Sequence, residues 1–107
     1  MEFIELPNFT RSIEGLHAKE AYRNLQLELI ANPEKGDLIQ GTGGFRKVRM
    51  ALEHQGKSGS TRVIYLYFLS AQTIVFGMIY KKTDRDTLSH DQKKTLRALA
   101  QELKEQL

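Results

Sequence analysis

The chain has 107 residues, of which 40% are hydrophobic and 27% charged, with three histidines and no cysteine. This length suits one domain spanning residues 1–107, and the lack of cysteine excludes disulfides, thiolate zinc sites and cysteine nucleophiles. The formal net charge of +3 permits a nucleic-acid partner without requiring one. No apolar stretch approaches the roughly 20 residues of a membrane span, and the acidic start Met1–Leu6 does not resemble a signal peptide, so we expect a cytoplasmic protein without membrane contact.

The N-terminal part predicts a short strand followed by two helices. Phe3–Leu6 has the pattern of a strand, and Asn8 or Thr10 is expected to cap a first helical segment. Apolar side chains recur at helical spacing across Lys19–Ala31, which predicts a second helix. This helix is expected to end before Pro33, because a proline pushes the preceding residue out of helical geometry.

The C-terminal part predicts three strands and a final helix. The strands are expected at Phe45–Leu52, Val63–Leu69 and Thr73–Tyr80, and the second is apolar on both sides, as in a central strand. Ser89 and Gln92 form a capping-box pattern that opens the last helix. The order predicts an α+β fold with a mostly antiparallel sheet, on which N-terminal helices and a C-terminal helix pack.

The glycine-rich segment Gly41–Gly44 precedes the first of these three strands. It lacks the spacing of a phosphate-binding loop and leads into a strand, so no helix N-terminus is available for an anion. We interpret these glycines as residues that allow a sharp entry into the sheet.

Cations concentrate on and beside the three C-terminal strands. Residues two apart in a strand share a face, so Lys47 and Arg49 project together, and Arg62 joins them if the next strand pairs as a hairpin. Three cations on one sheet face suit a phosphate backbone, whereas the alternative is a solvated charged surface. The whole cluster comprises Arg46, Lys47, Arg49, Lys57, Arg62, Lys81 and Lys82.

RNA cleavage is a reaction that such cations support without histidine. It needs a base near the 2′-hydroxyl, stabilisation of a dianionic phosphorane, and an acid for the 5′-oxygen. Crowding of like charges lowers the pKa of a lysine, which favours its use as a base, while arginines hold the phosphorane. No aspartate–glutamate cluster resembles a magnesium site, so we expect neither a metal nor another cofactor. Passive phosphate binding is the other use of the same cations.

The aromatic residues and the remaining polar residues give weaker signals. Tyr80 is the best candidate for stacking on a base because it lies beside Lys81 at a strand end, whereas alternating tyrosines such as Tyr65 and Tyr67 are usually core. His54 lies in the connection between the basic strands, where a histidine is generally just solvated. The cations of the last helix are interpreted as a solvated face: Lys93, Lys94, Arg97 and Lys104.

Two blocks, Gly36–Arg49 and Lys57–Tyr67, resemble the HigB toxins of the RelE/ParE superfamily, and Ile79–Lys82 and the C-terminal helical region agree. The resemblance implies a RelE-like fold and the toxin of a bacterial type II toxin–antitoxin system. It further implies a ribosome-dependent endoribonuclease that enters the ribosomal A site and cuts mRNA. The implied partners are a cognate antitoxin that neutralises the toxin by direct binding, the ribosome and mRNA, with DNA contacted only through the antitoxin complex.

The resemblance also implies roles for individual residues. The strand cations of RelE-like toxins match Lys47 and Arg49, the arginine that opens the next strand matches Arg62, and a basic pair follows the last strand. The implied catalytic residues are Lys47, Arg49, Arg62 and Lys82, and those implied to bind RNA or the ribosome are Arg46, Lys57, Tyr80 and Lys81. The tyrosine that RelE carries after the basic pair has no counterpart in Thr83–Leu88, so the general acid and base stay open.

Two other functions remain open from the sequence. A ParE-like toxin directed at gyrase would block a protein target without catalysis, and it would not need the cations at 47, 49, 62 and 82. An RNA-binding module without cleavage is the second alternative, and the missing tyrosine keeps it open.

Overall fold

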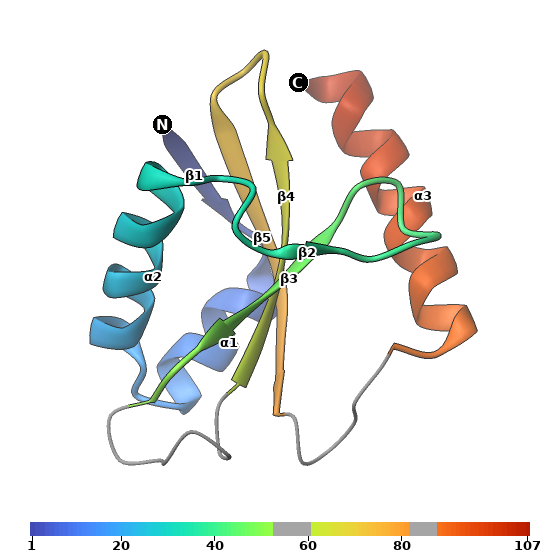
Figure 1. The fold of residues 1–107 in the computed structure, drawn as a ribbon. Coiled ribbons are helices and arrows are strands. Elements are labelled where there is room, and N and C mark those ends of the chain that lie inside the picture. Colours follow the sequence, from blue (N-terminus) through green and yellow to red (C-terminus); the bar gives the residue numbers. More distant parts are fainter. Residues whose placement is uncertain (53–60, 82–87) are drawn as a thin grey trace.

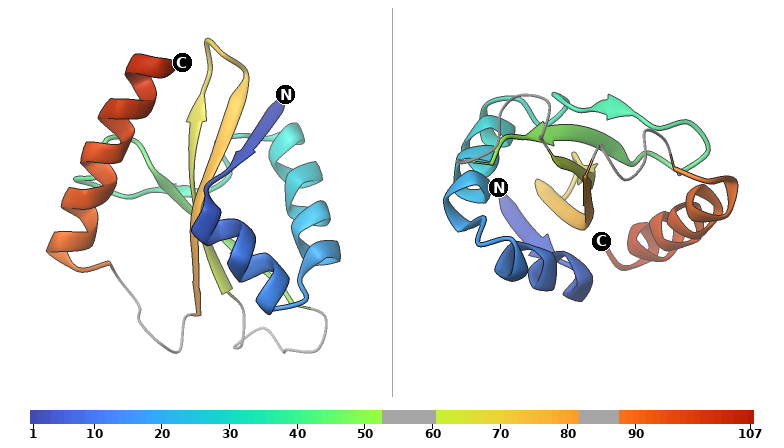
Figure 2. Two further views of the ribbon diagram at one scale, coloured as in Figure 1. Left: turned by 180° about the vertical axis from the view of Figure 1, so that it is seen from behind. Right: turned by 90° about the horizontal axis from the view of Figure 1, so that it is seen from below.

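The computed structural model describes residues 1–52, 61–81 and 88–107. One sheet lies in the middle, with α1 and α2 on one side and α3 on the other (Figures 1 and 2). The elements are β1 (Glu2–Glu5), α1 (Pro7–Gly15), α2 (Lys19–Ala31), β2 (Asp37–Leu38), β3 (Arg46–Met50), β4 (Thr61–Phe68), β5 (Thr73–Lys81) and α3 (His90–Gln106). The predicted α+β class, with N-terminal helices and a C-terminal helix packed on the sheet, is confirmed.

Within the described residues the five strands follow the order β1-β5-β4-β3-β2, and among these pairs only β1 and β5 are parallel. β4 and β5 are central and buried on both faces, as the apolar run in β4 predicted. The sequence predicted no strand between the second helix and Phe45, but Asp37–Leu38 form an edge strand paired with β3. Two residues are too few for a periodic signal, so only the pairing with β3 reveals β2.

The helix bounds test the sequence prediction at three places. The prediction for α2, Lys19–Ala31, is confirmed, and so is the capping box of α3, in which Ser89 and Gln92 exchange two hydrogen bonds. The predicted caps of α1 are wrong, because the helix already begins at Pro7, whose ring suits a first helical position. No helix in the described ranges is both long and apolar enough to cross a membrane.

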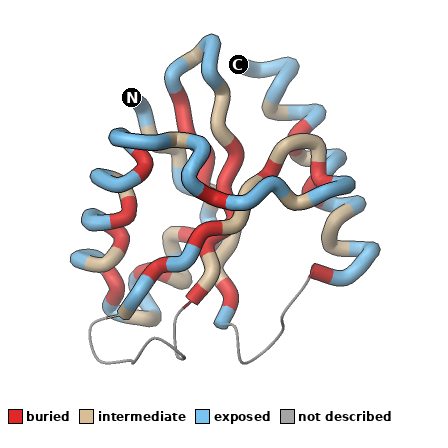
Figure 3. The backbone as a smooth tube through the Cα atoms, in the orientation of Figure 1, coloured by how far each residue is buried: buried red, intermediate tan, exposed pale blue. Residues whose placement is uncertain are grey.

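The two faces of the sheet carry separate apolar clusters, whose buried backbone is coloured red in Figure 3. On the side of α1 and α2 the largest buried side chains include Phe9, Leu25, Leu29, Tyr65 and Phe76. On the side of α3 the cluster includes Phe45, Ile64, Leu66, Leu96 and Ala100. Burial of each such side chain contributes about 1.5–3 kcal/mol, so both faces of β4 are held in place.

A β-bulge in β5 shifts the alternation of its side chains, so that residues on either side of the bulge change faces. Ile64 of β4 pairs with Met78, but the next residue, Tyr65, pairs with Phe76, so Gly77 is the extra residue. Plain alternation would place Phe76 and Met78 on one face. The bulge instead assigns Phe76 to the cluster beside α1 and α2, and Met78 to the cluster beside α3.

The connection between α2 and β2 is anchored to the sheet at Gly36. Its amide donates a hydrogen bond to the Tyr65 hydroxyl (2.9 Å), which itself donates to the Pro33 carbonyl oxygen (2.8 Å). A Cβ atom at residue 36 would lie 2.8 Å from the Lys47 carbonyl oxygen and 2.9 Å from a Tyr65 ring carbon. Only glycine therefore lets this connection approach β3 and β4 so closely.

We expect Gly36→Ala to destabilise the protein, because neither a strand carbonyl nor a buried ring can move away from the added methyl group. The loss should be about 1–3 kcal/mol, as for other overpacked sites. Gly15→Ala is the matched control, since a Cβ there meets nothing within 4 Å. Urea unfolding monitored by circular dichroism measures both variants. Equal midpoints for the two would contradict the close approach at Gly36.

Candidate functional site

Three cations of β3 and β4, Lys47, Arg49 and Arg62, emerge on one face of the sheet, as the sequence predicted. Arg49 lies directly opposite Arg62 in the antiparallel ladder, and Lys47 lies opposite Ile64. Ile64 belongs to the apolar cluster beneath α3, so the three side chains emerge on the α3 side. We call Lys47, Arg49 and Arg62 the sheet trio.

The sheet trio places like charges side by side. Directly opposed like charges destabilise a ladder by up to about 1 kcal/mol, and Arg49 faces Arg62 in this way. Arg49 is exposed, and Lys47 and Arg62 are half-buried, so all three can be reached from solvent. A bound anion would turn the mutual repulsion into attraction, which is the arrangement of a phosphate site.

A hollow of about 410 Å³ borders the sheet trio at the β2 edge. Lys47 and Arg49 line it from β3, but Asp37 and Glu28 line it as well. Asp37 lies directly opposite Lys47 in the β2–β3 ladder. Lys35 lines the hollow too, so the hollow is mixed in charge. Because Asp37 opposes Lys47, its side chain shares the face of the sheet trio and places one carboxylate at the β2 edge of that face.

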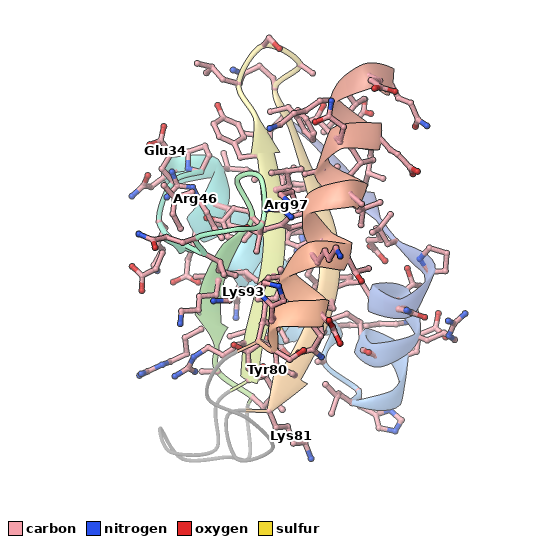
Figure 4. The ribbon with its side chains drawn as sticks, turned by 90° about the vertical axis from the view of Figure 1, so that its right-hand side faces the viewer. Glu34, Arg46, Tyr80, Lys81, Lys93 and Arg97 are labelled. Carbon is pink, nitrogen blue, oxygen red and sulfur yellow. The ribbon has the colours of Figure 1, made fainter. Side chains whose placement is uncertain are left out.

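Arg46 lies on the opposite face from the sheet trio. It is paired with Tyr65, and its Nη1 donates hydrogen bonds to the carbonyl oxygens of Gly36 (2.7 Å) and Glu34 (3.1 Å). Its Nη2 lies 3.6 Å from a Glu34 carboxylate oxygen, and Figure 4 shows the two side chains together, away from α3. These contacts anchor the connection between α2 and β2, so we leave Arg46 out of the RNA-binding set that the sequence suggested.

The two predicted RNA-binding residues at the end of β5 differ in exposure. Tyr80 lies opposite Arg62 on the α3 side, but it is only 8% exposed, in the cluster beneath α3. A ring buried in this way has no face free for a base, so the geometry does not favour the stacking suggested for Tyr80. Lys81 is exposed at the end of β5 (Figure 4), and its pairing with Thr61 places it on the other face from the sheet trio.

The glycine-rich segment packs against α3. Gly41, Gly43 and Gly44 have φ angles of 81°, 77° and 117°, which residues with a side chain rarely adopt, so the interpretation of these glycines as a sharp entry into the sheet is confirmed. A Cβ at Gly43 would lie 3.0 Å from that of Ala100, and Lys104 Nζ donates a hydrogen bond to the Gly43 carbonyl oxygen (2.9 Å). Sequence reasoning had treated Lys104 as solvated and missed this contact.

Comparison with known proteins identifies the family. Residues 15–106 match a family model described as the RelE toxin of the RelE/RelB toxin–antitoxin system. The chain belongs to the RelE toxin family. The matched range contains α2, α3 and every strand except β1, and therefore the whole sheet trio.

A solved structure of a mutant of the E. coli toxin RelE in the free state has the same fold as this RelE family member. The TM-score is 0.61 at 11% sequence identity, over 79% of this chain and 86% of that chain. Neither comparison distinguishes the HigB branch from the other RelE toxins, so that narrower assignment remains a prediction.

Some of the expected site residues lie outside the described part of the chain. These are Lys57 and Lys82, together with His54, and their roles remain predictions. Within the described ranges, no group of three or more histidine, cysteine, aspartate or glutamate side chains is arranged to hold a metal ion.

We expect Tyr65→Phe to destabilise the connection between α2 and β2, which packs against β3. Burial raises the pKa of Tyr65, so its hydroxyl stays neutral at physiological pH and bonds both Gly36 and Pro33. Its removal leaves the buried Gly36 amide unpaired, which costs about 1–3 kcal/mol. Tyr67→Phe is the control, because the Tyr67 hydroxyl makes no hydrogen bond with the described residues. Thermal unfolding compares the two, and equal losses would refute a special role for the Tyr65 hydroxyl.

Proposed function

We propose that this RelE family toxin is a ribosome-dependent mRNA endonuclease that cleaves by attack of a 2′-hydroxyl on the adjacent phosphate. The observation that carries the proposal is the sheet trio, three cations fixed on one face of rigid strands in a chain of this family. Such a face suits a phosphate whose negative charge increases during the reaction.

The reaction consists of one displacement at phosphorus. A base removes the proton of the 2′-hydroxyl, the freed oxygen bonds to phosphorus, and a dianionic phosphorane forms. The bond from phosphorus to the 5′-oxygen then breaks as that oxygen takes up a proton. The products are a 2′,3′-cyclic phosphate and a 5′-hydroxyl, so the cleavage consumes no water and changes no oxidation state.

The members of the sheet trio can be assigned different roles by their chemistry. Arginine stays protonated in proteins, so Arg62 and Arg49 act as fixed charges, and Arg62 stabilises the phosphorane together with Lys82. Lys47 is the one member of the trio whose side chain type can act as a general base, because an arginine guanidinium keeps its proton. We therefore assign the base to Lys47 and electrostatic support to Arg49.

The same family membership supports the proposed partners. We propose that a cognate antitoxin neutralises the toxin by direct binding, that the toxin acts in the ribosomal A site in the cytoplasm, and that DNA is reached only through the antitoxin complex. A basic face is a suitable target for an acidic antitoxin segment. Within the family we propose the HigB branch, on the resemblance of Gly36–Arg49 and Lys57–Tyr67.

We expect Arg62→Ala to lower cleavage by about 10²–10³-fold, the usual effect of losing one charge donor to a transition state. Primer extension on a defined mRNA, with purified protein and with or without programmed ribosomes, measures it. Arg23→Ala on α2, an exposed arginine away from the sheet trio, is the control and should cleave normally.

Two results would contradict the proposal in different ways. Full cleavage by a folded Arg62→Ala variant would refute the site. Absence of cleavage by a folded and toxic unaltered protein would refute the nuclease assignment. A supercoiling assay with purified gyrase would then test the ParE-like alternative.

We expect Lys47→Arg to show whether Lys47 acts as the general base or only as a fixed positive charge. The substitution keeps the positive charge but removes a group that can give up its proton, so single-turnover cleavage should fall by about 10²–10⁴-fold. Ribosome binding, measured by co-sedimentation, should stay unchanged. Cleavage at the normal rate would instead give Lys47 a purely electrostatic role.

A further inference from the structure

α3 carries three of its basic residues on one flank. At 3.6 residues per turn, Lys93, Arg97 and Lys104 fall within about 40° of one another around the helix axis. The acidic residues Asp91, Glu102 and Glu105 fall on the opposite flank of the same helix. Lys94 falls beside the acidic residues, so that side of the helix is mixed in sign, whereas Lys93, Arg97 and Lys104 form a basic flank without an acidic neighbour.

The basic flank of α3 is directed toward the chain that leads into β3. Its neighbour around the helix is Ala100, whose Cβ would lie 3.0 Å from a Cβ at Gly43, and Lys104 bonds the Gly43 carbonyl. The Cα and Cγ atoms of Arg97 would each lie 3.8 Å from the same added atom. Figure 4 shows Lys93 and Arg97 on the edge of α3 that faces β3.

The sheet trio emerges on this same side, because it shares a face with the residues that α3 covers. The basic flank of α3 and the sheet trio therefore border one surface from a helix and from a sheet. Lys104 donates its hydrogen bond to the Gly43 carbonyl oxygen and so connects α3 to the segment that leads into β3. Lys93 and Arg97 make no ion pair with any described residue, and Lys93 is half-buried, not freely solvated.

We propose that Lys93 and Arg97 form a second set of phosphate contacts. They bind RNA backbone phosphates beside the scissile phosphate, which the sheet trio holds. This inference rests on the proposed endonuclease function and extends its site to α3. The two sets of contacts would hold the RNA backbone from two sides: the α3 contacts add affinity, and the sheet trio acts on the scissile phosphate.

The surface chemistry favours a nucleic acid over a protein partner. Protein interfaces depend on buried apolar or aromatic anchors. In the described part of the chain, the exposed large hydrophobic residues are Met1, Leu27, Ile30, Leu38, Leu69 and Leu107, and none belongs to β3, β4 or the basic flank of α3. A surface of cations without such an anchor matches a polyanion whose binding is mainly electrostatic.

The test compares two double variants that each lose one lysine and one arginine charge. Lys93→Gln/Arg97→Gln alters the basic flank, whereas Lys94→Gln/Arg23→Gln alters exposed residues directed elsewhere. Each pair is placed in the Arg62→Ala background, so that binding to programmed ribosomes is measured without cleavage. Affinity is determined at several salt concentrations, and urea unfolding confirms that both variants fold.

We expect only the first variant to bind more weakly, with the slope of log affinity against log salt reduced by about 1.5, as for two lost phosphate contacts. A loss that is equal with and without mRNA on the ribosome places the contacts on ribosomal RNA. A loss confined to programmed ribosomes places them on mRNA. In the presence of Arg62, the same double variant should need more ribosomes for half-maximal cleavage but reach a similar maximal rate.

Unchanged affinity and salt slope in the first variant, together with normal cleavage by the unaltered protein, would overturn this inference alone. If the unaltered protein neither binds nor cleaves on ribosomes, the proposed function and this inference both fail.

Discussion

The antiparallel register of β3 on β4 is the constraint on which both the core and the candidate site depend. It sets Val48 opposite Val63 on one face and Arg49 opposite Arg62 on the other. A slip of one residue would exchange the two faces, burying cations beneath α2 and exposing valine. The apolar face therefore fixes the register, and the register assembles the cations despite their mutual repulsion.

Both ends of this pairing are held by contacts between distant parts of the chain. At the β2 edge, Gly36 lies against the Lys47 carbonyl and shares a hydrogen-bond network with Tyr65. At the α3 end, Gly43 lies against Ala100. A site built on strands anchored in this way keeps its charges in place before the substrate arrives, which reduces reorganisation during the reaction.

Much of the fold follows from local patterns, and the departures have local causes. The bounds of α2 and the capping box of α3 were predictable, because helical periodicity and cap chemistry act within a few residues. The start of α1 was misplaced because a proline at the first helical position was not weighed against the polar caps that follow it. In the candidate site, the shared face of Lys47 and Arg49 was predictable from strand alternation, whereas the structural role of Arg46 needed the position of Glu34 and Gly36.

The sequence by itself determined which residues alternate, where the helices lie and that cations gather on neighbouring strands, because these properties depend on spacing along the chain. Only the tertiary structure decided which way each face points. The bulge at Gly77 separates Phe76 from Met78, and Tyr80 becomes core because α3 covers it. The basic flank of α3 follows from its helical periodicity, but the contact between Gly43 and Ala100 directs this flank toward β3. Such orientations arise from packing between residues far apart in the chain, which no local pattern encodes.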